Sequence, residues 1–218
     1  MINGFIFDLD GVICDTAEYH YLAWKELGGK LGISLDREFN ENLKGLSRKR
    51  SLECILKLGN MHEEYTKAEI EKLTTEKNTH YLELINSVTP KDLLPGIKEF
   101  LHSLKERGFK IGLASASKNA PFLLRKLEVE NFFETIVDPA TLSNGKPNPE
   151  IFVKGAKQLG LPVSECVGIE DSYSGIQAIN GAGMFSVGVG DRGVLSDAKV
   201  VYSSTSQLDV DTIVELAR

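Results

Sequence analysis

The feature that most constrains this chain is the alternation of short apolar runs with amphipathic stretches from residue 97 onward. The apolar runs have the length and β-branched content of buried strands, and the stretches between them have the apolar spacing of helices. Strands that alternate with helices form a parallel sheet with right-handed crossovers. We therefore predict an α/β fold, a Rossmann-like doubly wound parallel sheet with helices on both faces. The expected strands are residues 111–114, 135–137, 166–169, 185–189 and 199–202.

Another strand is expected at residues 4–7, where a short run rich in aromatic and β-branched residues fits a buried sheet position. Two carboxylates follow it directly. If the chain stays extended through Leu9, Asp8 and Asp10 face the same way roughly 7 Å apart, and Gly11 then allows a turn without a Cβ penalty. Taken alone, this Asp-x-Asp-Gly segment fits a solvated acidic turn as well as it fits a functional pair of acids. The rest of the chain must decide between the two interpretations.

The segment between the first strand and residue 89 shows helical patterns and no convincing strand. Thr16, Ser47 and Thr66 are candidate helix caps, the last completed by Glu69 as a capping box. A helical block inserted directly after the first strand is expected to form a separate small domain. We predict an α/β core domain of residues 1–14 and 91–218 and an inserted helical cap domain of residues 15–90.

The composition indicates a globular protein and argues against some classes of partner. The chain has 218 residues, 42% hydrophobic and 26% charged, which is ordinary for a globular protein with a full core. A net charge of -6 argues against nucleic acid or an anionic membrane as the main partner. Three cysteines lie far apart with no C-x-x-C pair, as is typical of reduced cytoplasmic thiols. The N-terminal run has no basic lead and resembles neither a signal peptide nor an anchor, so we expect a cytoplasmic protein.

Several polar clusters follow the apolar runs directly, and in open parallel sheets ligands bind at the carboxyl ends of the strands. These strand ends would bring together Asp8, Asp10, Glu170 and Asp171. Four buried acids need compensating positive charge. A ligand set made only of oxygen atoms favours a hard cation, and we predict Mg²⁺ as the cofactor. Glu170 and Asp171 alone would fit a simple helix cap.

A carboxylate beside Mg²⁺ can attack phosphorus and form an aspartyl phosphate. Such a site must also bind three phosphoryl oxygens. Ser115 and the backbone N–H of Ala116 follow the expected strand at residues 111–114, and Lys146 lies in a loop constrained by glycine and proline. The sequence therefore indicates phosphoryl transfer, with Ser115, Ala116 and Lys146 as ligands of the transferring group.

Four short motifs lie at these positions: Phe7-Asp8-Leu9-Asp10-Gly11-Val12, Ala114-Ser115, Gly145-Lys146-Pro147 and Gly168-Ile169-Glu170-Asp171-Ser172. In order and spacing they resemble the four motifs of the haloacid dehalogenase superfamily over nearly the whole chain. The resemblance implies a mobile cap inserted after the first motif, Asp8 as nucleophile, and Asp10 as general acid and base. It also implies that Mg²⁺ is bound by Asp8, the Asp10 carbonyl, Glu170 and Asp171.

Further motifs are Thr16-Ala17-Glu18-Tyr19-His20 with Trp24, Leu43-Lys44-Gly45 with Ser47-Arg48 and Ser51, Lys77-Asn78, and Ser115-Ala116-Ser117-Lys118-Asn119. Within the superfamily they resemble the β-phosphoglucomutase family. The resemblance implies that the cap residues face a sugar phosphate. It places Thr16 and His20 with the catalytic residues, and it assigns substrate binding to Trp24, Lys44, Gly45, Arg48, Ser51, Lys77, Ala116, Ser117, Lys118 and Asn119.

A phosphomutase with a bisphosphorylated intermediate needs a second phosphate site, remote from Asp8. Arg48 offers a bidentate fork for this phosphate, helped by Ser117 and Asn119. Without the family resemblance, Arg48 would be interpreted as one charge of a solvated basic run. His20 also has a structural interpretation, as a buried histidine with no chemical role.

The leading hypothesis is a Mg²⁺-dependent phosphomutase that interconverts β-D-glucose 1-phosphate and glucose 6-phosphate. β-Glucose 1,6-bisphosphate would be its activator and intermediate. The alternative is a phosphatase of the same fold that acts on small sugar or polyol phosphates. A receiver-like domain that uses a phosphorylated Asp as a signal is disfavoured, because a receiver needs no cap. We expect small sugar phosphates as partners, no nucleic acid, no membrane, and a monomer.

Overall fold

The computed structural model describes residues 1–218 and divides them into two compact units. The core unit consists of Met1–Asp15 and Val88–Arg218, and the cap unit is Thr16–Ser87. The cap unit is therefore a single insertion, because the chain leaves the core unit after Asp15 and returns to it at Val88.

The core unit is built on one six-stranded sheet in the order β3-β2-β1-β4-β5-β6, and every neighbouring pair is parallel. This arrangement confirms the predicted α/β fold. The short strand expected near residue 200 is an edge strand of this sheet. The strands are β1 (Gly4–Phe7), β2 (Lys110–Leu113), β3 (Thr135–Ile136), β4 (Cys166–Glu170), β5 (Phe185–Val189) and β6 (Val200–Tyr202).

The register of the central strands brings their carboxyl ends to one edge of the sheet. Phe7 of β1 pairs with Leu113 of β2 and with Ile169 of β4. Asp8 follows Phe7 and donates its backbone N–H to the carbonyl of Ile169 at 2.9 Å. Glu170 follows Ile169 as the last residue of β4. Two acids therefore reach the carboxyl edge, where parallel sheets bind ligands.

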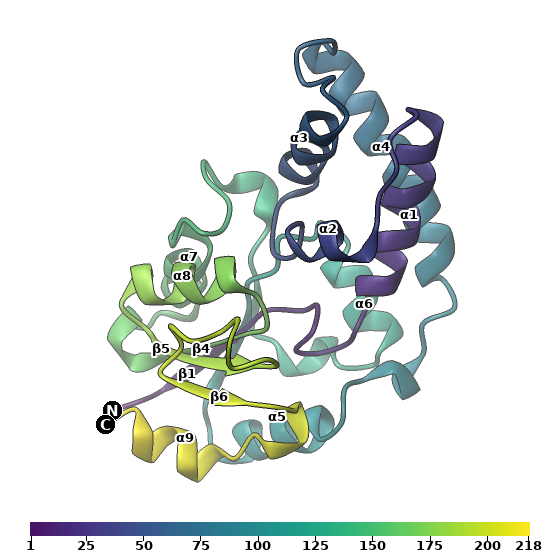
Figure 1. Ribbon diagram of the computed structural model, residues 1–218. Helices are drawn as coiled ribbons and strands as arrows, with labels where there is room; N and C mark the ends of the chain where they lie inside the picture. Colours follow the sequence, from purple (N-terminus) through teal and green to yellow (C-terminus); the bar gives the residue numbers. More distant parts are fainter. The chain divides into compact units, whose positions relative to one another are not determined.

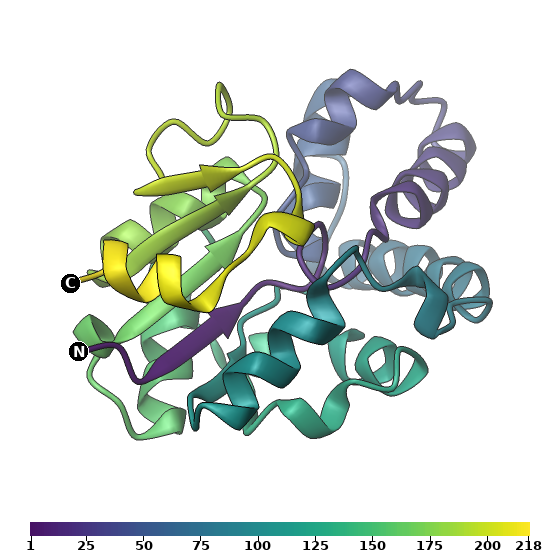
Figure 2. The ribbon, with the colours of Figure 1, turned by 90° about the horizontal axis from the view of Figure 1, so that it is seen from below.

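Helices cover both faces of the sheet (Figures 1 and 2). α7 (Glu150–Leu159) and α8 (Tyr173–Ala182) pack on one face, whereas α5 (Ile97–Glu106) and α9 (Val210–Leu216) lie on the other. α6 (Ala120–Lys126) follows β2 along the chain. Single 3-10 turns occur at Pro90–Asp92, Glu130–Phe132, Pro139–Thr141, Val163–Glu165 and Thr205–Gln207.

Side chains along β1 alternate between these two layers. Phe5 and Phe7 meet Phe100 of α5 edge-to-face, with ring centroids 6.0 and 6.1 Å apart. Ile6 joins the opposite apolar cluster, which contains Phe152 of α7. Successive side chains of a strand point to opposite faces, so β1 is buried on both. This double burial explains why its sequence is an unbroken apolar run.

The cap unit contains four helices and no strand: α1 (Ala17–Lys30), α2 (Arg37–Glu41), α3 (Arg48–Leu58) and α4 (Lys67–Ile85). α1 and α3 both pack against α4. Their apolar faces form one cluster, which includes Trp24, Leu52 and Ile55. No helix of either unit combines the length and the apolar composition needed to cross a membrane.

Two of the three predicted helix caps are confirmed. The hydroxyl of Ser47 accepts a hydrogen bond from the first turn of α3, and Thr66 and Glu69 form the predicted capping box of α4. Thr16 precedes α1 but makes no side-chain capping bond, because its backbone is not extended there. Its hydroxyl accepts a hydrogen bond from the Tyr81 hydroxyl at 3.1 Å instead. The sequence did not predict α2, whose five residues are too few to show a helical period.

Two leucines of α3 provide a test of the cap core. Leu52 is fully buried, whereas Leu58 is 45% exposed on the same helix. Leu52→Ala should lower the free energy of unfolding of the cap unit by about 2–5 kcal/mol, because it leaves a cavity. Leu58→Ala should change it by about 0.5 kcal/mol or less. Urea unfolding followed by circular dichroism measures both, and equal losses would contradict this packing.

Candidate active site

Asp8 and Asp10 lie in a turn that directly follows β1. Asp8 is only 5% exposed, and Asp10 is half-buried. The backbone N–H of Ile13 donates to the carbonyl of Leu9 at 2.8 Å, which closes the turn. Gly11 has a φ of 73°, a conformation that favours glycine. The turn therefore fixes the backbone on both sides of the two acids.

Lys146 is the positive charge at this edge of the sheet. Its side chain has no exposed surface, and Nζ donates to Asp8 Oδ1 at 2.6 Å and to Glu170 Oε1 at 2.5 Å. Burial by itself lowers the pKa of Lys146, but attraction to Asp8 and Glu170 outweighs burial and raises the pKa above its ordinary value. Lys146 is therefore charged at neutral pH and joins the ends of β1 and β4.

The pKa of Asp8 is also raised, which for a carboxyl group disfavours the charged form. Burial raises the pKa of Asp8 to about 7, against the attraction of Lys146, and the negative charges of Glu170 and Asp10 add to the rise. The attraction of Lys146 therefore does not offset the combined effect of burial and the neighbouring acids on Asp8.

Three carboxylates are close enough to share one cation. Oxygen atoms of Asp8, Glu170 and Asp171 lie within 4.8 Å of one another, and no histidine or cysteine belongs to the set. Carboxylate oxygens are the ligands of hard cations such as Mg²⁺, and the excess negative charge around Asp8 favours the same ion. The side chain of Asp10, which was expected to join the other acids, lies outside this set. The family resemblance implies its backbone carbonyl as the metal ligand.

The loop after β2 is ordered by its own serines. Ser115 is buried, and its Oγ accepts a hydrogen bond from the backbone N–H of Ser117 at 3.1 Å. Ser117 Oγ in turn accepts from the backbone N–H of Asn119 at 3.2 Å. Ala116 is half-buried and Lys118 is exposed. The loop therefore holds a buried hydroxyl at the end of β2, next along the sheet from Asp8.

Ser172 was not among the predicted site residues, yet it fixes Glu170. The backbone N–H and the hydroxyl of Ser172 donate to Glu170 Oε2 at 2.7 and 2.8 Å. Glu170 is fully buried, so these bonds replace the water that its carboxylate loses. A serine that directly precedes a helix is an N-cap signal in the sequence, and Ser172 does cap α8.

The cap unit has a second polar cluster, built around Lys77. Lys77 is 2% exposed, and its Nζ lies 2.7 Å from His20 Nδ1. Nζ also lies over the rings of Trp24 and Tyr81, 4.7 and 4.6 Å from their centroids. Burial holds the pKa of His20 well below its usual range, and the positive charges of Lys77 and Arg48 lower it further. His20 is therefore neutral and accepts a hydrogen bond from Lys77.

Tyr81 is a further residue that the sequence interpretation missed. Its ring is fully buried and stacks on His20 with centroids 4.1 Å apart. Its hydroxyl donates to Thr16, and its face lies beneath the ammonium of Lys77. The spacing offered a signal, because Tyr81 lies one helical turn after Lys77. One aromatic residue thus contacts three of the predicted site residues of the cap.

The remaining predicted cap residues lie at the start of α3 and in the loop before it. Arg48 is the first residue of α3 and is half-buried, and Ser51 is buried one turn later. Lys44 forms an ion pair with Glu41, with 2.8 Å between Nζ and Oε2. Gly45 has a φ of 73°.

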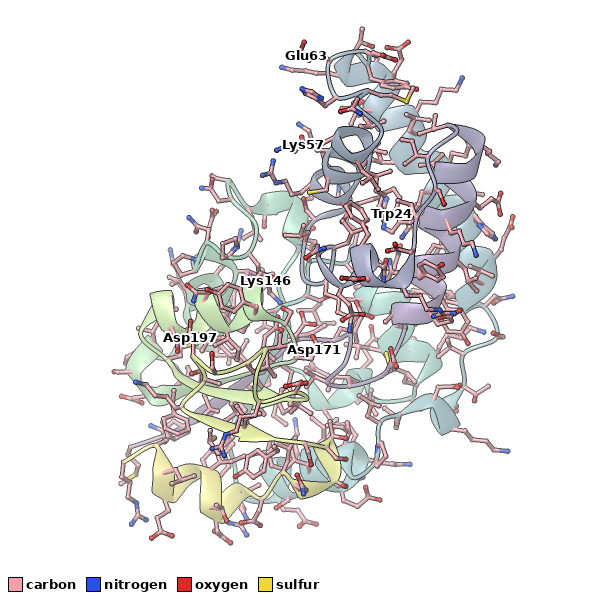
Figure 3. All side chains as sticks on the ribbon, viewed as in Figure 1. Trp24, Lys57, Glu63, Lys146, Asp171 and Asp197 are labelled. Atoms are coloured by element: carbon pink, nitrogen blue, oxygen red, sulfur yellow. The ribbon has the colours of Figure 1, made fainter.

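The structure therefore brings together Asp8, Lys146, Glu170 and Asp171 within the core unit, and Thr16, His20 and Lys77 within the cap unit. Lys146 and Asp171 are labelled in the core unit in Figure 3, and Trp24 is labelled among the cap helices. Acids dominate the first cluster, and cationic and aromatic side chains dominate the second.

The sequence and the fold of this chain are similar to those of known proteins. A family model described as haloacid dehalogenase-like hydrolase matches residues 2–183. A beta-phosphoglucomutase of Bacillus subtilis is 50% identical over 96% of this chain and 93% of its own length. A fructose-1-phosphate phosphatase of Escherichia coli is 32% identical over 85% of this chain and 95% of its own. A crystal structure of beta-phosphoglucomutase from Clostridium difficile matches with a TM-score of 0.98 and 48% identity, covering 100% of this chain and 97% of that one.

The contact between Lys77 and His20 generates a prediction. Lys77→Met removes a positive charge next to the imidazole, so the pKa of His20 should rise, although burial still keeps it below its usual range. Titration of the His20 ring signals by NMR measures the change. Lys72→Met is the control, because Lys72 is exposed on the same helix. An unchanged His20 titration in a folded Lys77→Met protein would contradict the assigned contact.

Proposed function

The chain belongs to the haloacid dehalogenase-like hydrolase family, and on that basis we propose that it is a Mg²⁺-dependent phosphomutase. It would interconvert β-D-glucose 1-phosphate and glucose 6-phosphate through β-glucose 1,6-bisphosphate and a phosphorylated aspartate. The observation that carries the proposal is the likeness to beta-phosphoglucomutases, which extends over nearly the whole chain and includes the inserted cap. The phosphatase relatives are more distant.

Asp8 is the proposed nucleophile. One of its carboxylate oxygens would form a bond to phosphorus while the bond between phosphorus and the sugar oxygen breaks. Lys146, already hydrogen-bonded to Asp8, would offset charge on the phosphoryl oxygens, together with the Ser115 hydroxyl and the backbone N–H of Ala116. Asp10 would protonate the departing sugar oxygen and, in the next half-reaction, remove the proton from the attacking sugar hydroxyl.

Mg²⁺ would be held by Asp8, the Asp10 carbonyl, Glu170 and Asp171. When bound, it would neutralise part of the acidic charge and draw electron density from the phosphoryl oxygens. Without that charge compensation, the acids would repel a phosphate dianion. The oxygen-only donor set around Asp8 supports this choice of ion.

The cap residues favour a mutase over a phosphatase. A mutase must hold a phosphate that is not being transferred, and Arg48 is proposed for it. Ser117, Lys118 and Asn119 are proposed as further substrate-binding residues. Thr16 and His20 are proposed to act with the catalytic residues. We assign the sugar-binding role to the remaining cap residues Trp24, Lys44, Gly45, Ser51 and Lys77. A phosphatase of small sugar or polyol phosphates is the second candidate, supported by the fructose-1-phosphate phosphatase among the relatives.

We further propose a cytoplasmic monomer. Cys14, Cys54 and Cys166 are all unpaired thiols, as expected in a reducing compartment. Burial holds the pKa of Cys14 well above its usual range, so this thiol is unreactive at neutral pH.

One assay separates the two candidate functions. The protein is incubated with Mg²⁺, β-glucose 1-phosphate and a trace of β-glucose 1,6-bisphosphate, and glucose 6-phosphate and free phosphate are measured together. A mutase yields glucose 6-phosphate, whereas predominant release of free phosphate would show a phosphatase. Asp8→Asn should reduce either activity to background because it removes the attacking charge. Substantial activity of Asp8→Asn would refute the assigned nucleophile.

Arg48→Ala should depress the mutase reaction by about 10²-fold, since the loss of a charge-assisted phosphate contact costs several kcal/mol. It should leave hydrolysis of acetyl phosphate nearly unchanged, because that donor has no second phosphate. Arg50→Ala is the control, because Arg50 is exposed on the same helix and paired with Glu53 at 3.1 Å. Equal losses of both activities in Arg48→Ala would exclude a role specific to the second phosphate.

A further inference from the structure

Gly175 is the third residue of α8 and lies against one of the acids at the edge of the sheet. A Cβ atom built on Gly175 would lie 1.9 Å from both Cδ and Oε1 of Glu170, far inside any possible contact. The backbone gives no other reason for glycine, because Gly175 is helical and its φ is not positive. Glycine is among the least favourable residues in a helix. The side chain of Glu170 occupies the space that a Cβ atom at position 175 would need, and this explains why the residue is glycine.

The carboxylate of Glu170 cannot easily move aside. Ser172 holds Oε2 through its backbone N–H and its hydroxyl, and Lys146 holds Oε1. The hydroxyl of Ser172 also accepts a hydrogen bond from the backbone N–H of Gly175 at 3.1 Å. A displaced carboxylate would lose these partners in a fully buried position, where an unpaired charge is costly.

We propose that Gly175 is a positioning residue for the cation site. The missing side chain at Gly175 provides the space for Glu170, and this placement keeps Glu170 within 4.8 Å of the oxygens of Asp8 and Asp171. The inference rests on the proposed function, in which these acids hold Mg²⁺. A Cβ atom built on Gly11 would also lie too close to an acid, 2.1 Å from Asp171 Oδ2, but the positive φ of Gly11 is a separate reason for glycine. Gly175 is therefore the cleaner position for a test.

The first measurement is cation binding by the full chain without substrate, with Mn²⁺ as the probe and free Mn²⁺ counted by electron paramagnetic resonance. Gly175→Ala should weaken Mn²⁺ binding by about tenfold or more, as expected for a change that displaces a ligand. Gly181→Ala is the matched control on the same helix, because its Cβ would meet only Pro149 at 3.6 Å. Gly181→Ala should leave the affinity unchanged. Wild-type affinity in Gly175→Ala would overturn the proposal.

A double-mutant cycle identifies Glu170 as the cause. Glu170→Ala removes the carboxylate that the new methyl group would strike, so adding Gly175→Ala to it should leave the Mn²⁺ affinity unchanged. It should not lower the metal-free melting temperature, because alanine is the better helix former once the clash is gone. Gly175→Ala alone should lower that melting temperature. An equal effect of Gly175→Ala in both backgrounds would overturn the proposal.

The same double-mutant cycle remains decisive if Gly175→Ala does not fold. If Gly175→Ala alone does not fold, the double variant should fold; a double variant that also fails would show that Glu170 is not the obstacle and would overturn the proposal. A wild-type protein that does not bind Mn²⁺ would instead refute the proposed function. The metal-free melting temperatures would still decide whether Gly175 makes room for Glu170.

Discussion

The rest of the site depends on one buried contact, the ammonium of Lys146 between the carboxylates of Asp8 and Glu170. The register of β1 and β4 forces these two acids to the same edge of the sheet. Removing one partner from a buried ion pair leaves an uncompensated charge, at a cost of about 3–5 kcal/mol. The strands can therefore end in acids only because the loop before α7 brings a lysine to both of them.

This contact does not balance the site. Asp8, Asp10, Glu170 and Asp171 carry four negative charges when ionised, and Lys146 supplies one positive charge, so four minus one leaves three. Burial raises the pKa of Asp8 to about 7, and the negative charges of Glu170 and Asp10 contribute a smaller part of the rise. A divalent cation would reduce the excess from three to one. The proposed dependence on Mg²⁺ thus follows from the charge of the chain as much as from the family.

The sequence predicted the features that depend on local patterns and on motifs. The parallel sheet followed from the alternation of apolar runs, and the likeness to the haloacid dehalogenase superfamily and to β-phosphoglucomutases followed from the motifs; the comparisons confirm both. Some of the missed features depend on three-dimensional contacts that a local sequence pattern does not show. Thr16 was expected to cap α1, but its partner Tyr81 lies 65 residues away. Gly175 has a purpose only once the position of Glu170 is known.

The two clusters also hold their lysines in different ways, and this difference bears on function. Lys146 is held by two acids, Asp8 and Glu170, whose combined negative charge exceeds its own. Trp24 and Tyr81 hold Lys77 by their ring faces, which attract an ammonium group without supplying a net negative charge. His20 adds a neutral acceptor, because burial and the charges of Lys77 and Arg48 keep its pKa low. The aromatic rings thus hold Lys77 without neutralising it by an acid, which suits the sugar-binding role proposed for this cluster.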